Sequence, residues 1–241
     1  MIFSLKDMID FLPPLLDGAV LTIAVSLLAF SLAMVSGLAI GIARISRMAP
    51  LRVVSACYIQ FIRGTPLLLQ LFFIYYVLPY AGIVLSPFVS GAIGLTLNYA
   101  AYMAEVFRSG IQAIPKGQWE AGSSVGMSRS LLMRRIILPQ AARFIIPPLG
   151  NEFNAMLKNS TLVSVIGVQE LLLTTETLTS ATFRVFELYS IVALYFLTLT
   201  TAWGFVQGWI EAKFGKSGAS RQEAPSLGRR LFGSLRLRMA R

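Results

Sequence analysis

The 241-residue chain contains no histidine and a single cysteine, Cys57. The lack of histidine excludes catalytic triads with an imidazole base, histidine-ligated metal sites and histidine proton shuttles. One cysteine cannot form a disulfide within the chain. Charge is also scarce, because only 13% of the residues are charged while 56% are hydrophobic. This composition is typical of a protein that lies in a lipid bilayer and not of a soluble domain.

The formal net charge of +10 is concentrated at the C-terminal end of the sequence. Residues 213–241 contain eight Lys/Arg and one acidic residue, Glu223, whereas the rest of the chain contains 13 basic and 10 acidic residues. The high pI therefore reflects this segment, and it does not indicate a nucleic-acid groove or a nucleic-acid partner. We expect a basic, disordered cytoplasmic tail that lies on anionic membrane lipid.

Five apolar segments have lengths that suit a bilayer crossing, and they predict an all-α membrane protein with a transmembrane domain over residues 1–212. These segments cover residues 19–43, 53–85, 88–107, 139–157 and 185–210. Basic residues follow the first, third and fifth segments, so the positive-inside rule predicts an external N-terminus and a cytoplasmic C-terminus. Residues 161–184 are too polar for a span and predict an external amphipathic helix with a loop.

Glycine and proline mark special points within these segments. The first and last segments each contain a GxxxG step, which is typical of close helix packing. The run Arg63-Gly64-Thr65-Pro66 predicts a helix that restarts with Thr65 as N-cap, or a kinked helix. Such a break can aim a helix N-terminus at a ligand carboxylate, and a simple interfacial start of the span is the alternative. Pro147-Pro148 removes two backbone donors and predicts that the fourth span bends or opens.

Polar residues follow one face of the third segment. Asn98, Tyr102 and Glu105 are spaced i, i+4 and i+7, so they share a helical stripe. A carboxylate near the middle of a span costs on the order of 3 kcal/mol, and the stripe should therefore face the protein interior or a wet cavity. For Glu105, an ion pair with Arg108 is the alternative interpretation.

The polar, basic segment 116–139 lies between the third and fourth spans and predicts two short helices outside the membrane. Its landmarks have a regular spacing: Glu120-Ala121-Gly122, then Gly126, then Ile136 and Leu138-Pro139. Gly126 supplies the backbone freedom for a turn between the short helices. This spacing resembles the EAA loop of ABC-transporter permeases, with Gly122 where that family usually has alanine. An ordinary basic cytoplasmic loop is the alternative.

Three further runs are similar to the polar amino-acid branch of this permease family, and together the resemblance covers residues 17–208. The runs are RGTPLLLQLFFIYY, LNYAAYMAEVFRSGIQAIPKGQWEAG and LPQAARFIIPPLGNEFNAMLKNSTLVSVIG. The resemblance implies a permease with the type I ABC importer fold in the cell inner (plasma) membrane, importing polar amino acids. It also implies three kinds of protein partner: ATP-binding cassette ATPase subunits, a second permease chain, identical or paralogous, and an external solute-binding protein.

The resemblance also assigns roles to particular residues. Coupling to the ATPase is implied for the loop residues Glu120, Ala121, Gly122 and Gly126. The substrate path is implied for Asn98, Tyr102 and Glu105, and Asn159 joins them at a position where the family often has aspartate. An amide at Asn159 accepts a hydrogen bond from an ammonium group but supplies no charge, which leaves a preference for basic amino acids open.

Two other functions remain open from the sequence. A membrane-embedded enzyme would need Ser124, Ser160 or the carboxylates Glu105 and Glu152 as catalytic groups. Residues 122–126 match the GxSxG pattern, yet they lack the strand-turn-helix setting and the histidine that hydrolases use. A membrane scaffold would leave the polar residues inside the spans unexplained. We expect no metal site, no cofactor and no nucleotide site in the chain, so that ATP is hydrolysed by a partner.

Overall fold

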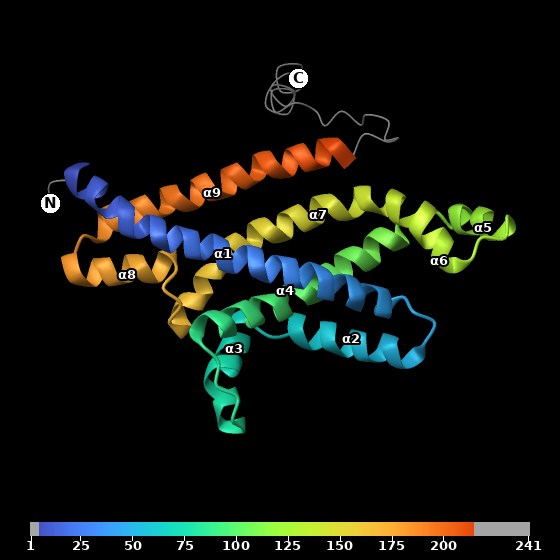
Figure 1. Ribbon diagram of the computed structural model, residues 1–241, viewed down its shortest axis with the longest axis horizontal. Coiled ribbons are helices and arrows are strands. Elements are labelled where there is room, and N and C mark those ends of the chain that lie inside the picture. Colours follow the sequence, from blue (N-terminus) through green and yellow to red (C-terminus); the bar gives the residue numbers. More distant parts are fainter. Residues whose placement is uncertain (1–4, 215–241) are drawn as a thin grey trace, which may run out of the picture.

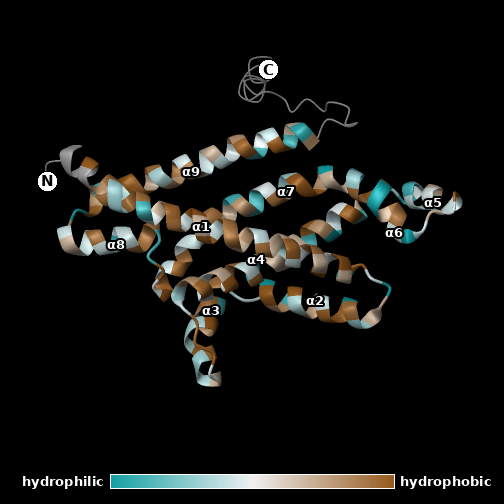
Figure 2. Cartoon of the chain, viewed as in Figure 1, coloured by the Kyte–Doolittle hydropathy of each residue, from teal (hydrophilic) through white to brown (hydrophobic). Residues whose placement is uncertain are grey.

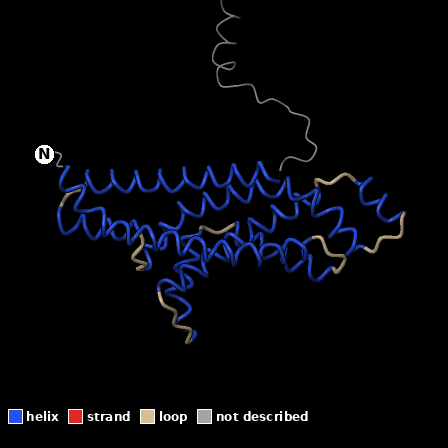
Figure 3. Tube along the Cα trace, turned by 45° about the horizontal axis from the view of Figure 1, so that its top comes forward, coloured by secondary structure: helices blue, strands red, loops and turns tan. Residues whose placement is uncertain are grey.

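The computed structural model describes residues 5–214, so nearly all of the predicted basic tail lies outside the described residues. Four long helices run along the long axis of the molecule (Figure 1): α1 (Leu5–Arg44), α4 (Pro87–Gln112), α7 (Leu138–Asn159) and α9 (Val185–Phe214). The described residues are helical with short connecting loops and contain no strand (Figure 3). The predicted all-helical fold is confirmed.

Shorter elements complete the bundle. Helix α2 (Ala49–Arg63) runs back beside α4, and α3 (Leu67–Phe72) with η1 (Phe73–Val77) and η2 (Leu78–Ala81) projects sideways (Figure 1). Between α4 and α7 lie α5 (Lys116–Ser124), α6 (Arg129–Leu132) and η3 (Met133–Ile137). After α7 follow η4 (Ser160–Ile166) and α8 (Leu171–Thr182), where the sequence predicted an external amphipathic helix with a loop.

By length and apolar composition alone, fewer helices could cross a membrane than the five spans that the sequence predicted. Within residues 5–214, α1 and α9 meet these criteria by themselves, and up to four segments do if each bent helix pair is one span. Helix α4 does not qualify, although it is the most enclosed helix of the bundle. Its polar residues reduce its hydropathy, and they are accommodated because α4 is surrounded by protein on several sides.

Helices α1 and α4 pack closely, and glycine makes this possible. A Cβ atom at Gly37 would lie 2.8 Å from the Met103 Cβ, and one at Gly41 would lie 2.9 Å from the Ala104 carbonyl oxygen. The first GxxxG step is therefore a packing surface, as predicted. The second step is different, because a Cβ at Gly204 or Gly208 would meet nothing within 4 Å.

The predicted break after α2 is present, but its cap is not the predicted one. The segments Ala49–Arg63 and Leu67–Ala81 meet at an angle of 103°. The Thr65 hydroxyl donates to the Phe61 carbonyl oxygen at 3.0 Å, and Phe61 belongs to the preceding helix, α2. The N-cap position of α3 is Pro66, which provides no side-chain hydrogen bond. The prediction of Thr65 as N-cap was wrong because its hydroxyl has an acceptor in the preceding turn.

The two ends of the bundle differ in polarity. Hydrophobic residues extend along α1, α2 and α9, whereas hydrophilic residues gather around α5 and α6 and in the α1–α2 turn at the same end (Figure 2). Helix α8 and the start of α1 lie at the other end (Figure 1). Near that end the buried Glu170 carboxylate accepts hydrogen bonds from the amides of Leu172 and Leu173 and from the Thr22 hydroxyl, which ties α8 to α1.

Candidate functional site: a polar pocket and an exposed helical loop

A polar pocket of about 510 Å³ lies where the α2–α3 break meets α4 and α7. Its lining includes three of the four predicted path residues, Asn98, Tyr102 and Asn159. The helix break contributes residues from Arg63 to Leu67, and α7 contributes Glu152 and Ala155. The pocket is therefore assembled from parts of the chain that lie far apart in sequence.

Asn98 has a partner that the sequence did not reveal. The Asn98 side-chain amide donates to the Gln70 Oε1 atom at 3.1 Å, and Asn98 is only 7% exposed. The Gln70 amide in turn donates to the Ile62 carbonyl oxygen at 2.8 Å and to the Thr65 hydroxyl at 2.9 Å. Asn98 thereby holds the broken helix against α4, and it shapes the pocket wall as well as lining it.

Asn159 is fixed at the other side of the pocket. Its amide donates to the Tyr99 hydroxyl at 2.9 Å, and the Tyr99 ring is buried between the helices. The side-chain oxygen of Asn159 takes no part in this bond and is the hydrogen-bond acceptor of the amide group. The bond between Asn159 and Tyr99 joins two neutral side chains.

The structure adds two charged residues to the site that the sequence analysis did not place there. Arg63 lies with its guanidinium carbon 5.1 Å from the centre of the Tyr102 ring, a cation–π contact, and Glu152 lines the same pocket. A polar pocket between membrane helices that presents one cation and one carboxylate offers complementary charges to a zwitterion. The signal in the sequence was weak, since both residues border long apolar runs and resemble interfacial charges.

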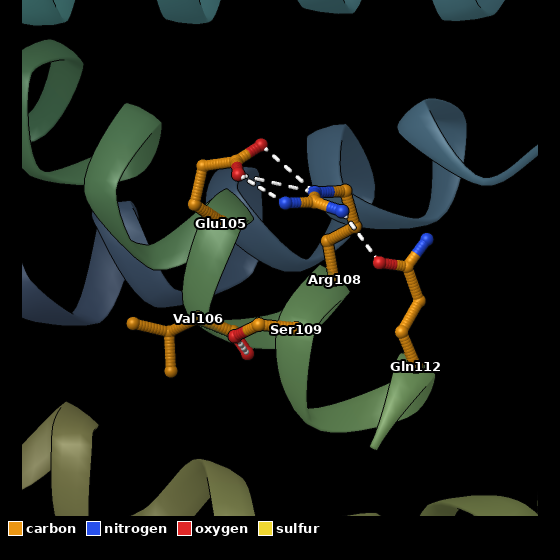
Figure 4. A network of polar contacts seen from close by, with 5 residues as sticks. All are labelled: Glu105, Val106, Arg108, Ser109 and Gln112. Atoms are coloured by element: carbon orange, nitrogen blue, oxygen red, sulfur yellow. Dashed lines mark hydrogen bonds and ion pairs between the residues drawn. The ribbon is translucent and has the colours of Figure 1, made fainter. Parts of the chain in front are cut away.

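Glu105 does not line this pocket. Its carboxylate instead forms a bidentate ion pair with Arg108, at 2.7 Å from the Nη2 atom and 3.1 Å from Nε (Figure 4). Arg108 also donates to the Gln112 side-chain oxygen one turn further along. The alternative of an i, i+3 pair, left open by the sequence, describes the position of Glu105 in the structure.

The loop over residues 116–139 folds as two short helices with the predicted glycine turn. Gly126 has φ = 77°, the left-handed conformation that favours glycine. The Met127 amide donates to the Gly122 carbonyl oxygen and the Gly126 amide to that of Ser123, which is a Schellman motif at the end of α5. Glu120 and Ala121, the first two residues of the motif, are exposed and face outward from the bundle.

Gly122 has a packing reason to be glycine in this chain. It is buried, and a Cβ atom there would lie 2.3 Å from the Leu132 Cδ1 atom of α6. The departure from the usual alanine thus brings α5 and α6 closer together. Beside them lies a hollow of about 710 Å³, whose lining includes Glu120, Arg129 and Arg47 of the α1–α2 turn.

The described part of the chain contains no group of three or more Cys, Asp or Glu residues that could hold a metal ion. The candidate nucleophiles are also engaged elsewhere: the Ser124 hydroxyl donates to the Glu120 carbonyl oxygen and the Ser160 hydroxyl to that of Leu157. Both bonds are ordinary contacts within a helix.

A membrane helix bundle with a polar pocket between the α2–α3 break, α4 and α7, and with an exposed two-helix loop at one end, has the architecture of a membrane transport subunit. The chain belongs to the family of binding-protein-dependent transport system inner membrane components, which matches residues 33–216. Members of this family are inner-membrane permeases, which work with a separate ATPase and a solute-binding protein. They are transport components, and ATP hydrolysis takes place on the partner.

Curated relatives cover most of the chain. The probable glutamine ABC transporter permease protein GlnM of Bacillus subtilis is 39% identical over 202 residues, or 84% of this chain and 94% of the relative. The L-cystine transport system permease protein TcyB of the same organism is 45% identical over 67% of this chain and 69% of its own length. The glutamine transport system permease protein GlnP of Escherichia coli is 36% identical over 84% and 93%.

Solved structures support the fold. A crystal structure of an amino acid ABC transporter with histidines has a chain that is 38% identical, with a TM-score of 0.83 over 88% of this chain and all of that one. The MetNI methionine ABC transporter in an inward-facing conformation has a TM-score of 0.73 at 18% identity, which shows the fold alone.

Proposed function

We propose that this permease imports polar amino acids through the pocket at the α2–α3 break. The observation that carries the proposal is the presence of Arg63 and Glu152 in one pocket of about 510 Å³. An amino acid carries a carboxylate and an ammonium group, so Arg63 binds the first and Glu152 the second. Tyr102 and Asn159 then contact the side chain, together with Asn98.

Relatives of this chain are named as glutamine and L-cystine permeases, which supports an amino-acid substrate. The neutral amide of Asn159 and its bond to Tyr99 favour a polar, uncharged substrate side chain over a cationic one. Glu105 lies on the same helix as Asn98 and Tyr102 but outside this pocket, where its carboxylate is paired with Arg108.

The loop of α5 and α6 couples this pocket to the ATPase. Glu120, Ala121, Gly122 and Gly126 form the docking unit, with Glu120 exposed at its surface. From Arg129 to Asn159 the chain is continuous helix through α6, η3 and α7. Fourteen residues separate Leu138 from Glu152, or about 21 Å at 1.5 Å per residue, so α7 transmits a movement of the loop directly to the pocket.

The assembly that follows has two permease chains, identical or paralogous, which enclose the path between them. ATPase subunits dock on α5 and α6 at the cytoplasmic side, and the solute-binding protein delivers substrate at the end that carries α8. The N-terminus lies outside and the C-terminus inside, as the basic residues of the α1–α2 turn and of α6 indicate. The basic segment 213–241 contacts anionic lipid.

The pocket is tested by transport in proteoliposomes that hold the assembled importer, with L-glutamine and L-cystine in a panel of amino acids. Glu152→Gln and Arg63→Gln each remove one charge-assisted hydrogen bond, so the half-saturating substrate concentration should rise roughly 10-fold or more. Lys213→Gln, an exposed charge in the last turn of α9, serves as control. Parental uptake by both pocket variants would refute this site.

The coupling loop is tested separately. Glu120→Ala and Gly126→Pro should abolish ATP-driven uptake while the chain remains in the membrane, because they alter the docking helix and its turn. Gly208→Ala, on a face of α9 where a Cβ atom meets nothing within 4 Å, should leave uptake unchanged. Normal uptake by both loop variants would refute the proposed coupling through this loop.

The side of the membrane on which the α5–α6 loop lies is tested by chemical labelling. In a Cys57→Ser background, Ser124→Cys should react with a membrane-impermeant maleimide only from the cytoplasmic side. Labelling of intact cells from outside would invert the proposed topology.

A further inference from the structure

Helix α7 has one face that lines the polar pocket and another that packs against α9 and α1. Glu152, Ala155 and Asn159 line the polar pocket at spacings of i, i+3 and i+7. Gly150 and Phe153 lie on another face, where they contact α9 and α1. Since successive residues are about 100° apart around a helix, any rotation of α7 moves both faces together.

The position of Glu152 is sensitive to such rotation. A side chain ends about 5–6 Å from the helix axis, so a turn of about 30° displaces it by about 3 Å. That displacement equals the length of a hydrogen bond. Pro147 and Pro148, one turn earlier, lack N–H groups and remove two hydrogen bonds that would stiffen the helix there. Helix α7 nevertheless continues through both prolines, so it does not open there, which was one of the two outcomes that the sequence predicted.

Trp203 of α9 contacts this weakened stretch in two ways. Its indole Nε1 donates to the Gly150 carbonyl oxygen at 2.8 Å. Its ring lies 4.2 Å from the ring of Phe153, which in turn packs edge-on against Phe30 of α1 at 4.9 Å. Phe153 is 4% exposed, so this stack connects three helices beside Glu152.

Beyond Trp203, α9 contacts α7 through the polar side chain of Gln207, which donates to the Pro147 carbonyl oxygen at 3.4 Å and to the Asn151 Oδ1 atom at 3.3 Å. Within α9 the buried residues are Glu187, Leu188, Ile191 and Val192, all in its first turns. An apolar hollow of about 260 Å³ lies next to Trp203 and includes Phe30 in its lining. The indole therefore borders a hollow on one side, and its bond to Gly150 together with its contact with the Phe153 ring sets its position.

We propose that Trp203 is a positioning residue for substrate binding, which fixes the rotation of α7 so that the Glu152 carboxylate faces the pocket. Trp203 contacts the carbonyl oxygen two residues before Glu152 and the ring one residue after it. Gln207 supports the same turn, because it lies over Gly150 where a Cβ atom would come within 2.5 Å of its Cδ.

This inference rests on the proposed function of Glu152. Trp203→Phe keeps an aromatic ring and removes the N–H donor, so the half-saturating substrate concentration should rise about five-fold with little change in the maximal rate. The assay is substrate-stimulated ATP hydrolysis by the reconstituted importer with its ATPase and binding protein, with L-glutamine or the panel amino acid that is transported fastest. Trp209→Phe is the matched control, a tryptophan of the same helix that is 64% exposed.

A double-mutant cycle separates positioning from general stability. If Trp203 acts through Glu152, adding Trp203→Phe to Glu152→Gln should have no further effect on the half-saturating concentration. Independent effects that multiply, or a Trp203→Phe variant that behaves like Trp209→Phe, would overturn the inference while leaving the pocket proposal intact. A parental response of Glu152→Gln would overturn both.

Gly150→Ala provides a second route if Trp203→Phe fails to assemble. The added methyl group would lie 2.5 Å from the Gln207 Cδ atom and displaces this side chain from the turn that it supports, so the half-saturating concentration should again rise several-fold. An unchanged value in this variant, with the importer assembled, would refute the positioning role.

Discussion

The two GxxxG steps of this chain should respond in opposite ways to the same substitution. Gly37 and Gly41 of α1 face α4, whereas Gly204 and Gly208 of α9 face open space. Alanine raises helix propensity by roughly 1 kcal/mol over glycine at any interior helical position. The sign of the net effect therefore depends on what the new methyl group meets.

At Gly41 the methyl carbon would lie 2.9 Å from the Ala104 carbonyl oxygen and 3.1 Å from the Phe107 Cβ. A backbone oxygen moves only with its helix, so α1 and α4 must separate. Overpacking of this kind costs about 1–3 kcal/mol, and subtraction of the propensity gain leaves a net loss of up to about 2 kcal/mol for Gly41→Ala. For Gly208→Ala nothing opposes the gain, and stability should rise by up to about 1 kcal/mol.

The assay is the thermal unfolding midpoint of the detergent-purified chain, measured for Gly41→Ala, Gly208→Ala and the parent in the same detergent. We expect Gly41→Ala to unfold at a lower temperature and Gly208→Ala at an equal or higher one. Equal destabilisation by both, or a stabilised Gly41→Ala, would refute the assignment of the first step to the α1–α4 contact.

Three other substitutions test the loop, the buried carboxylate and the helix break. Gly126→Ala forces a side chain into φ = 77°, so it should cost about 1–2 kcal/mol and lower ATP-coupled uptake, whereas Gly117→Ala, which meets nothing within 4 Å, should not. Glu170→Ala removes the cap of α8 and should lower the free energy of unfolding by about 1–3 kcal/mol, while Glu170→Gln should cost less in the same thermal assay. Asn98→Leu leaves the Gln70 side-chain oxygen unpaired and should cost about 1–3 kcal/mol; a parental midpoint would show that this bond is dispensable.

Local patterns in the sequence predicted much of this molecule. Apolar runs located the four long helices, although within residues 5–214 α1 and α9 alone meet the length and hydropathy criteria for a span by themselves. The turn at Gly126 and the break at Gly64–Pro66 followed from backbone chemistry that belongs to those residues alone. The EAA spacing indicated the family, since it is a pattern of neighbouring positions and needs no tertiary information.

The tertiary structure decided which polar residues face one another. Along α4, Asn98 and Glu105 share a stripe in the sequence, yet one reaches Gln70 across the bundle and the other pairs with Arg108 on its own helix. Helical periodicity gives the face of a residue but not the partner that a neighbouring helix presents. Arg63 and Glu152 lie 89 positions apart and meet in one pocket only because α2 and α7 both pack against α4. The sequence by itself thus determined the helices and the loop, while the packing of those helices determined the site, because long-range contacts leave no periodic mark on either segment.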